Sequence, residues 1–213
     1  VVRFFNRFPF FMIKHPNQRV GVFIDVQNMY YSARNLYGAK VNFGEVVRKA
    51  VENRQLIRAI AYVVRTKTGE EKPFFEALYH QGIEYKEKEI QEFFGGAKKA
   101  DWDVGMVVDA IRISANLDVV IIASGDGDFV PLVEYLRNQG RQVEVVSFRE
   151  SSSTKLVESV DVYTDLSADQ DAYLIRDGSG RGRRPPTEKP EPPADKPPAG
   201  HGTIIRDGKE IPV

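Results

Sequence analysis

Paired carboxylates at the end of an apolar run are the first feature of this sequence that could do chemistry. The run VVII leads directly into the stretch ASGDGDF at 123–129, which places Asp126 and Asp128 two residues apart. Asp25 ends the apolar run VGVFI in the same way. Carboxylates that lie close together raise each other's pKa and oppose folding unless a positive charge is bound between them. These residues therefore predict a site for Mg²⁺ or Mn²⁺, which prefer oxygen ligands.

A further acidic group comes from the stretch KKADWDVGMVVD, which contains Asp101, Asp103 and Asp109. An aspartate at a helix start is commonly a cap, because the free N–H groups and the helix dipole favour a negative charge there, and this interpretation suits Asp101. Asp103 is the better candidate for the acidic site because a loop rich in glycine and lysine precedes it. Asp109 follows roughly 240° further around a helix, so we expect it to be at most an outer group.

The elements that must position these residues alternate along the chain. Apolar, β-branched runs predict strands at 20–26, 59–65, 119–123 and 143–148, and polar alternation predicts an edge strand at 84–90. Helical periodicity predicts helices at 43–53, 72–81, 102–116, 129–139 and 153–160. Continuous apolar strands that alternate with helices indicate a parallel sheet covered on both faces. Such sheets place their sites at the carboxyl ends of the strands, where Asp25 and Asp126 would meet.

Composition excludes several classes of protein. The 30 Lys and Arg residues balance 30 Asp and Glu, which argues against a chain that binds polyanions over its whole surface. With no cysteine and three histidines, disulfides and thiolate metal sites are excluded, so any metal would have oxygen ligands. No stretch approaches the roughly 20 apolar residues that span a bilayer. We therefore expect a soluble, cytoplasmic protein.

The chain divides into four segments. Residues 1–18 form an aromatic and basic extension, which either packs on the domain or is disordered, or else binds a membrane surface or nucleic acid. Residues 19–169 form the α/β domain. Residues 170–200 are rich in proline and glycine, which predicts a linker, and the tail at 201–213 predicts a hairpin around Asp207-Gly208.

Three stretches together resemble the NYN domain family, in its bacterial LabA-like branch, within the PIN-like nuclease superfamily. They are FIDVQN, KKADWDVGMVVD and ASGDGDFVPLVEYLRNQGRQVEVV, and the resemblance covers about residues 19–167. It implies an α/β fold of the Rossmann-like, PIN-like kind: a three-layer α/β/α sandwich with a mainly parallel sheet. It also implies a metal-dependent ribonuclease, a hydrolase that cleaves the phosphodiester bonds of RNA with Mg²⁺ or Mn²⁺.

The resemblance also implies roles for individual residues. The acidic positions that would hold the metal and carry catalysis are Asp25, Asp103, Asp126 and Asp128. The polar positions beside them, which would contact the substrate, are Asn28 and Ser124. Two structural alternatives remain open: Asn28 would cap a helix that begins there, and Ser124 would stabilise a turn.

Basic and aromatic residues near the acidic stretch suggest a path for RNA, which we expect to be single-stranded. The candidate phosphate contacts are Lys98 and Lys99, with Arg65, Lys67, Lys86 and Lys88. Phe93, Phe94 and Trp102 would stack on unpaired bases. The alternative is that the lysines are solvated and the aromatic side chains are packing residues.

Rival functions fit the sequence less well or differ in kind. A dehalogenase-like phosphotransferase would carry D-x-D on the first strand and a Toprim domain a glutamate there, whereas this chain has the sequence DVQN from Asp25. The stronger rival is a non-catalytic scaffold that binds RNA or protein through the same domain. The sequence also leaves open a homodimer and a protein partner for the Pro-rich tail.

Overall fold

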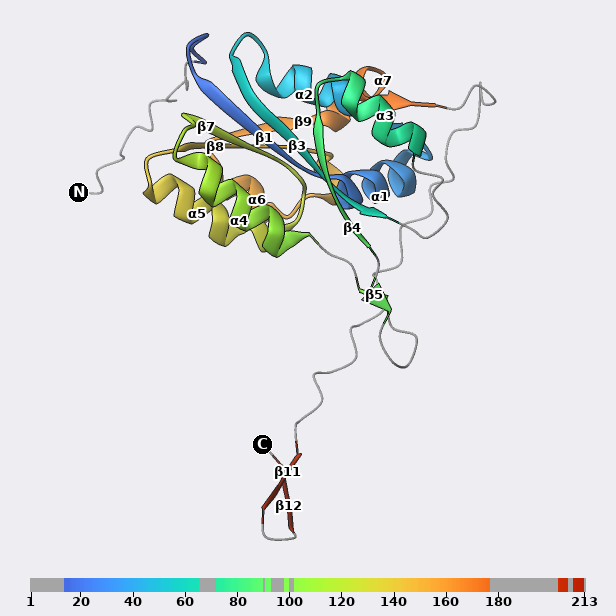
Figure 1. Ribbon diagram of the computed structural model, residues 1–213, viewed down its shortest axis with the longest axis vertical. Coiled ribbons are helices and arrows are strands. Elements are labelled where there is room, and N and C mark those ends of the chain that lie inside the picture. The colour runs from blue at the N-terminus through green and yellow to red at the C-terminus, as the bar shows by residue number, and fades with distance from the viewer. Residues whose placement is uncertain are drawn as a thin grey trace, which may run out of the picture. The chain divides into compact units, whose positions relative to one another are not determined.

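A computed structural model describes residues 14–65, 72–89 and 102–176, together with the backbone of short strands at 91–92, 98–99, 203–206 and 209–212. Its centre is a six-stranded sheet, drawn in Figure 1 with β1 and β3 in the middle of the domain. In spatial order its strands are β4 (Glu84–Glu89), β3 (Gln55–Arg65), β1 (Arg19–Asp25), β7 (Val119–Ala123), β8 (Gln142–Ser147) and β9 (Val162–Asp165).

Every neighbouring pair in this sheet is parallel. From β1 the chain first builds outward through β3 and β4, then returns to the other side of β1 and builds outward through β7, β8 and β9. This is the strand order of doubly wound α/β folds, with a switch point between β1 and β7. The predicted α/β fold with a parallel sheet is therefore confirmed, and β4 lies at the predicted edge.

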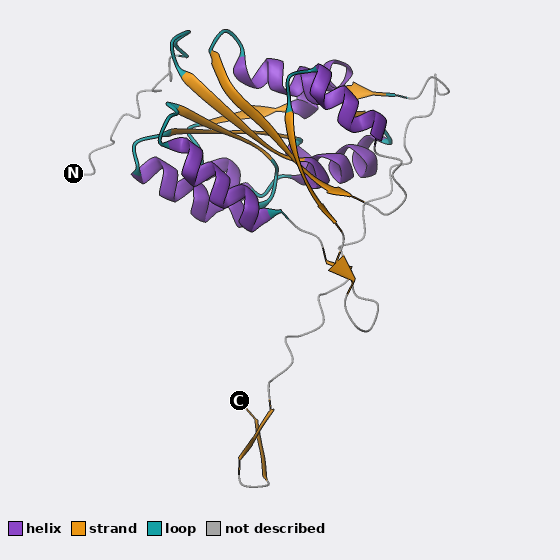
Figure 2. Cartoon of the chain, in the orientation of Figure 1, coloured by secondary structure: helices purple, strands orange, loops and turns teal. Residues whose placement is uncertain are grey.

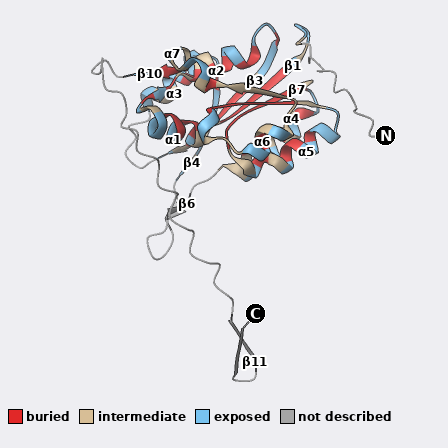
Figure 3. Cartoon of the chain, turned by 180° about the vertical axis from the view of Figure 1, so that it is seen from behind, coloured by how far each residue is buried: buried red, intermediate tan, exposed pale blue. Residues whose placement is uncertain are grey.

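Helices cover both faces of the sheet, as Figures 1 and 2 show. One face carries α1 (Val26–Tyr37), α2 (Phe43–Val51), α3 (Lys72–His80) and α7 (Gln170–Tyr173). The other carries α4 (Asp103–Ser114), α5 (Val130–Asn138) and α6 (Thr154–Ser159). Two separate apolar cores result, one on each face, and the buried central strands are visible in Figure 3. Burial of apolar surface on both faces explains why the central strands read as unbroken apolar runs.

The predicted set gave no bounds for a helix after β1 and no strand at the far edge of the sheet, where the structure has α1 and β9. Helix α1 has the sequence VQNMYYSARNLY, whose tyrosines, asparagines and valine are weak helix formers. It forms because Asp25 caps its start, Gly38 ends it with φ of 60°, and its Met29 and Ala33 are buried. Strand β9 is short and only partly buried, so it lacks the apolar run that marks the central strands.

The domain continues beyond residue 169, where the predicted boundary lies. Helix α7 begins at Gln170, and β10 (Leu174–Ile175) pairs antiparallel with β2 (Lys40–Val41). Tyr173 and Leu174 are buried in the core beneath α2. Because these apolar side chains pack on the domain, the first compact unit extends to Gly178, and the segment predicted as linker from 170 begins with structured residues.

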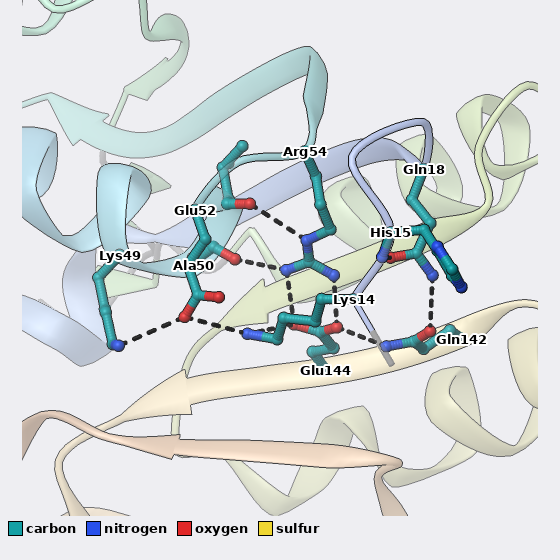
Figure 4. Close-up of polar contacts among 10 residues, drawn as sticks. Lys14, His15, Gln18, Lys49, Ala50, Glu52, Arg54, Gln142 and Glu144 are labelled. Carbon is teal, nitrogen blue, oxygen red and sulfur yellow. Dashed lines mark hydrogen bonds and ion pairs between the residues drawn. The ribbon is translucent and has the colours of Figure 1, made fainter. Parts of the chain in front are cut away.

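A buried ion pair joins the amino ends of β3 and β8 (Figure 4). The Arg54 guanidinium donates to both carboxylate oxygens of Glu144, at 2.6 and 3.0 Å, and to the backbone carbonyls of Ala50 and Val51. Lys14, within the predicted N-terminal extension, lies 4.0 Å from the same carboxylate. The rest of that extension, residues 1–13, lies outside the described residues.

The second compact unit, Ser179–Val213, contains an antiparallel strand pair. Strand β11 (Thr203–Arg206) pairs with β12 (Lys209–Pro212), with Arg206 opposite Lys209. Another short antiparallel pair, β5 (Gln91–Glu92) with β6 (Lys98–Lys99), lies in the chain between β4 and α4. Within the described ranges, no helix is both long and apolar enough to cross a membrane.

Candidate functional site

The switch point of the sheet brings the acidic residues together. Asp25 is the last residue of β1, and Asp126 follows β7, whose final residue Ala123 pairs with Ile24. Because β1 and β7 are parallel neighbours, the loops that follow them leave the sheet at the same edge. Ligand sites of doubly wound folds lie at such a point, where strand order reverses.

Three carboxylates form a group that could hold a metal ion. One oxygen each from Asp103, Asp126 and Asp128 lies within 4.8 Å of the other two. Asp103 reaches the group from the first position of α4, and Asp126 and Asp128 come from the loop after β7. Carboxylate oxygens are the ligands that Mg²⁺ and Mn²⁺ prefer, so this donor set fits a hard divalent cation.

Asp25 lies beside this group and not within it. Its Oδ1 accepts a hydrogen bond from the backbone N–H of Asn28 at 3.0 Å, and its Oδ2 accepts one from the Ser124 hydroxyl at 3.2 Å. Burial raises the pKa of Asp25 to about 6, and the negative charges of Asp103 and Asp126 add to this rise while the two hydrogen bonds oppose it. The site therefore holds a fourth carboxylate whose ionisation depends on its neighbours.

Asn28 and Ser124 tie the two loops to each other. The Asn28 side-chain oxygen accepts from the backbone N–H of Gly125 at 3.0 Å. The Ser124 hydroxyl, besides donating to Asp25, accepts from the backbone N–H of Asp126 at 3.2 Å. Asp25, and not Asn28, caps α1. Both polar residues thus position the acidic loops. For Ser124 this is the turn-stabilising alternative that the sequence left open. For Asn28 it is a bracing role that the sequence did not indicate.

A serine-rich loop after β8 packs against the acidic loop and was not identified from the sequence. The backbone N–H of Ser153 donates to the carbonyl of Gly125 at 2.8 Å. A Cβ atom on Gly125 would lie 2.8 Å from the carbonyl oxygen of Ser151, and one on Gly127 would lie 2.8 Å from the Ser153 hydroxyl. Gly125 is therefore required for the close approach of the two loops, because the atom that its Cβ would meet belongs to the backbone.

Trp102 determines where α4, and with it Asp103, begins. Its indole N–H donates to the carbonyl of Val63 in β3 at 2.8 Å, and its ring packs edge-on against Tyr62. The ring folds back over the first turn of α4, where a Cβ on Gly105 would lie 2.7 Å from it. Trp102 is accordingly a packing residue that orients Asp103, although it also lines the cavity at the site.

Two of the candidate groove residues form ion pairs within the domain. Lys86 pairs with Asp109 at 2.6 Å, and Arg65 pairs with Glu87 at 3.5 Å. Asp109 also accepts from the Tyr62 hydroxyl at 2.9 Å, and it is not a member of the three-carboxylate group. The side chains of Lys98 and Lys99 lie outside the described residues, as do Lys67, Phe93, Phe94 and Asp101.

A cavity of about 430 Å³ opens at the acidic group. Asp25, Asp103 and Asp126 line it. Residues of α1 also line it, among them Tyr31 and Asn35. These residues were missed because α1 was not predicted over its full length. A cavity of this size is typical of small-ligand sites.

Comparisons with known proteins agree with this geometry. Residues 19–167 match the NYN domain family. The chain is 25% identical over 189 residues to the low amplitude and bright protein LabA of Synechococcus elongatus, a match that covers 82% of this chain and 91% of LabA. The crystal structure of a Vibrio parahaemolyticus protein of unknown function is similar, with a TM-score of 0.69 and 29% identity over 77% of this chain and 100% of that one. Because the family match includes the whole six-stranded sheet and the four acidic residues at its carboxyl edge, this chain belongs to the NYN domain family.

Proposed function

We propose that this chain is a metal-dependent ribonuclease that hydrolyses phosphodiester bonds of single-stranded RNA. The observation that carries the proposal is the group of three carboxylates, Asp103, Asp126 and Asp128, whose oxygens lie within 4.8 Å of one another. Its place at the switch point of the sheet, beside a cavity, supports a ligand site. Membership of the NYN domain family supports a nuclease-like function on RNA.

The three carboxylates would hold Mg²⁺ or Mn²⁺. When bound, such an ion lowers the pKa of a water molecule and neutralises the charge that develops on a phosphate. In the net reaction a water oxygen forms a bond to phosphorus, and the bond from phosphorus to the leaving ribose oxygen breaks. One water proton passes to the leaving oxygen and the other to solvent, so no protein nucleophile is needed.

The chain's own residues supply the rigid frame around this chemistry. Asn28 accepts from the backbone of Gly125, and Ser124 links Asp25 to the backbone of Asp126, so together they hold the loop of Asp126 against the start of α1. Trp102 holds the start of α4, so that Asp103 meets the other carboxylates. Asp25 adds negative charge beside the group, and a bound cation would favour its ionised form. Such preorganisation matters because electrostatic stabilisation costs no rearrangement during the reaction.

Lys98 and Lys99 remain our proposed contacts to the RNA backbone. They form β6, in the segment that leads from β4 to α4 and therefore to Asp103. Lysines that contact phosphates displace counterions, so their contribution weakens as salt rises. Replacing both with alanine is expected to reduce the salt dependence of RNA binding without changing the dependence of cleavage on metal concentration.

The test of the proposal is cleavage of a labelled single-stranded RNA by the intact chain with Mn²⁺ or Mg²⁺. We expect cleavage to stop with EDTA and to fall by about a hundredfold or more in Asp126→Asn, because weakening one ligand of the ion weakens the electrostatic stabilisation of the transition state. The matched control is Glu76→Gln, an exposed carboxylate on α3, which should cleave at the wild-type rate. Folding of each variant is checked by circular dichroism.

Two results would contradict the proposal. Cleavage that persists in EDTA and in Asp126→Asn would indicate a contaminating nuclease. Metal-independent retention of RNA without any cleavage would instead support the rival function, a binding scaffold built on the same domain.

A further inference from the structure

The cavity at the acidic group continues along one side of α1. Gln27, Tyr31 and Asn35 all line it, and they are spaced four residues apart in that helix. Residues four apart lie on the same side of a helix, one turn above another. Since α1 starts at Val26, directly after Asp25, this stripe begins at the acidic group and leads away from it.

The stripe offers an aromatic ring between two carboxamides. Tyr31 is 49% exposed, and its ring is braced edge-on by Tyr30 at 5.4 Å between centroids. Arg34 donates to the Tyr30 hydroxyl and so holds that brace in place. Gln27 and Asn35 are exposed, and within the described ranges neither carboxamide has an intramolecular hydrogen bond. A ring and unpaired carboxamides facing one cavity are suited to a flat ligand with a polar edge.

The charged residues that line the cavity restrict the class of ligand that it could bind. Of the described residues, no lysine or arginine lines it, so a phosphate group has no cationic partner along the stripe. Stacking and hydrogen bonding remain as the available interactions. Unpaired RNA bases are recognised in this way, on aromatic side chains and through their hydrogen-bonding edges. Asparagine and glutamine carboxamides pair well with a base edge because they carry a donor and an acceptor side by side.

We infer that this cavity binds the unpaired base next to the scissile phosphate, with the base stacked on Tyr31 and the carboxamides of Gln27 and Asn35 at its edge. The inference rests on the proposed ribonuclease function, because a phosphodiester at the acidic group would carry its neighbouring nucleoside into the same cavity. A double-stranded RNA could not place a base there without unpairing it. The stripe therefore makes the site selective for single strands.

The test compares RNA binding by Tyr31→Ala, Tyr31→Phe and the wild type, with Ca²⁺ replacing Mg²⁺ to prevent turnover. Fluorescence anisotropy of a labelled single-stranded oligoadenylate gives the Kd. We expect Tyr31→Ala to weaken binding at least about fivefold, the lower limit for one stacked base, and Tyr31→Phe to bind as the wild type does. Tyr79→Ala is the matched control, since Tyr79 is a 76% exposed tyrosine on α3, and it should not change the Kd.

A second ligand separates stacking from a general loss of fold. An oligoribonucleotide of the same length without bases should bind the wild type and Tyr31→Ala equally, because it has nothing to stack. Gln27→Ala with Asn35→Ala should reduce the differences in Kd among oligoadenylate, oligouridylate and oligocytidylate by several fold. Because stacking is not electrostatic, the effect of Tyr31→Ala should be the same at low and high salt, unlike that of the Lys98 and Lys99 variants.

The outcomes distinguish the inference from the proposed function. Metal-dependent cleavage by the wild type, with unchanged Kd and cleavage rate in Tyr31→Ala, would overturn the base site and leave the ribonuclease standing. An equal loss of affinity in Tyr31→Phe and Tyr31→Ala would also overturn it, because the hydroxyl and not the ring would then matter. A wild type that neither binds nor cleaves RNA would overturn both.

Discussion

The two ends of the central sheet differ in whether their charged side chains are paired with opposite charges. At the amino end, Arg54 and Glu144 are 1% and 3% exposed, yet each charge is matched by the other and by further hydrogen bonds (Figure 4). At the carboxyl end, three carboxylates converge and Asp25 lies half-buried beside them. One end satisfies its charges internally, whereas the other accumulates charge of a single sign. The difference indicates that the amino end serves the fold and that the carboxyl end is built for a ligand.

Removing one partner of the buried pair should have the largest effect. We expect Arg54→Met to lower the free energy of unfolding by about 3 to 5 kcal/mol, because it leaves the Glu144 carboxylate buried without its counterion. Urea denaturation measures this loss. The double variant Arg54→Met with Glu144→Leu should recover much of it, and a double variant as unstable as the single one would show that the pair's geometry, and not its charge, matters.

Adding a cation should stabilise the carboxyl end and leave the amino end unaffected. At a hundredfold excess of Mn²⁺ over its Kd, the free energy of unfolding should rise by about 2.7 kcal/mol. Asp126→Asn should show little of this rise, whereas Glu76→Gln should show all of it. Thermal unfolding with and without Mn²⁺ provides the measurement, and equal shifts in both variants would place the ion elsewhere.

In the absence of metal, the carboxyl end should be less stable at higher pH. Because the pKa of Asp25 is raised to about 6 in the folded state, its contribution to stability is fully present below the unfolded pKa near 3.8 and is lost as pH rises through about 6. Asp25→Asn should therefore be more stable than the wild type by about 3 kcal/mol at pH 7.5 in EDTA, since each unit of the rise in pKa corresponds to about 1.4 kcal/mol. Asparagine can still cap α1.

Urea titrations between pH 4 and 8 test this expectation. The advantage of Asp25→Asn should shrink as pH falls, since the wild-type carboxyl then takes up its proton. A stability difference that stays constant over this range would mean that the ionisation of Asp25 does not change the free energy of unfolding.

An exposed pair at the amino end should show the smallest effect. Arg19 and Asp118 form two side-chain hydrogen bonds, but their side chains are 45% and 39% exposed. Surface pairs of this kind contribute roughly 0 to 1 kcal/mol, so Arg19→Met should be nearly neutral in the same urea assay. A loss as large as that of Arg54→Met would show that burial does not determine how much an ion pair contributes to the stability of this protein.

The sequence predicted the elements that carry their own local pattern. The five predicted strands are present, and the ends of the five predicted helices lie within two residues of the observed ends. The sequence also predicted that Asp25 and Asp126 lie at the same edge of the sheet, because parallel neighbouring strands end at a common edge. Helix α1 was predicted only as a possible start near Asn28, because its residues are weak helix formers and its stability comes from a cap and from burial of Met29 and Ala33.

The sequence by itself determined the alternation of strands and helices, the order of the acidic motifs and the family. Only the tertiary structure decided which distant residues meet: Glu144 with Arg54, 90 positions away, the serine loop with Gly125, and Tyr31 with the acidic cavity. It also separated Asp25 from the three carboxylates that converge. The physical reason is that periodicity and caps act between near neighbours in the chain, whereas these contacts depend on strand order and on how helices pack across the sheet.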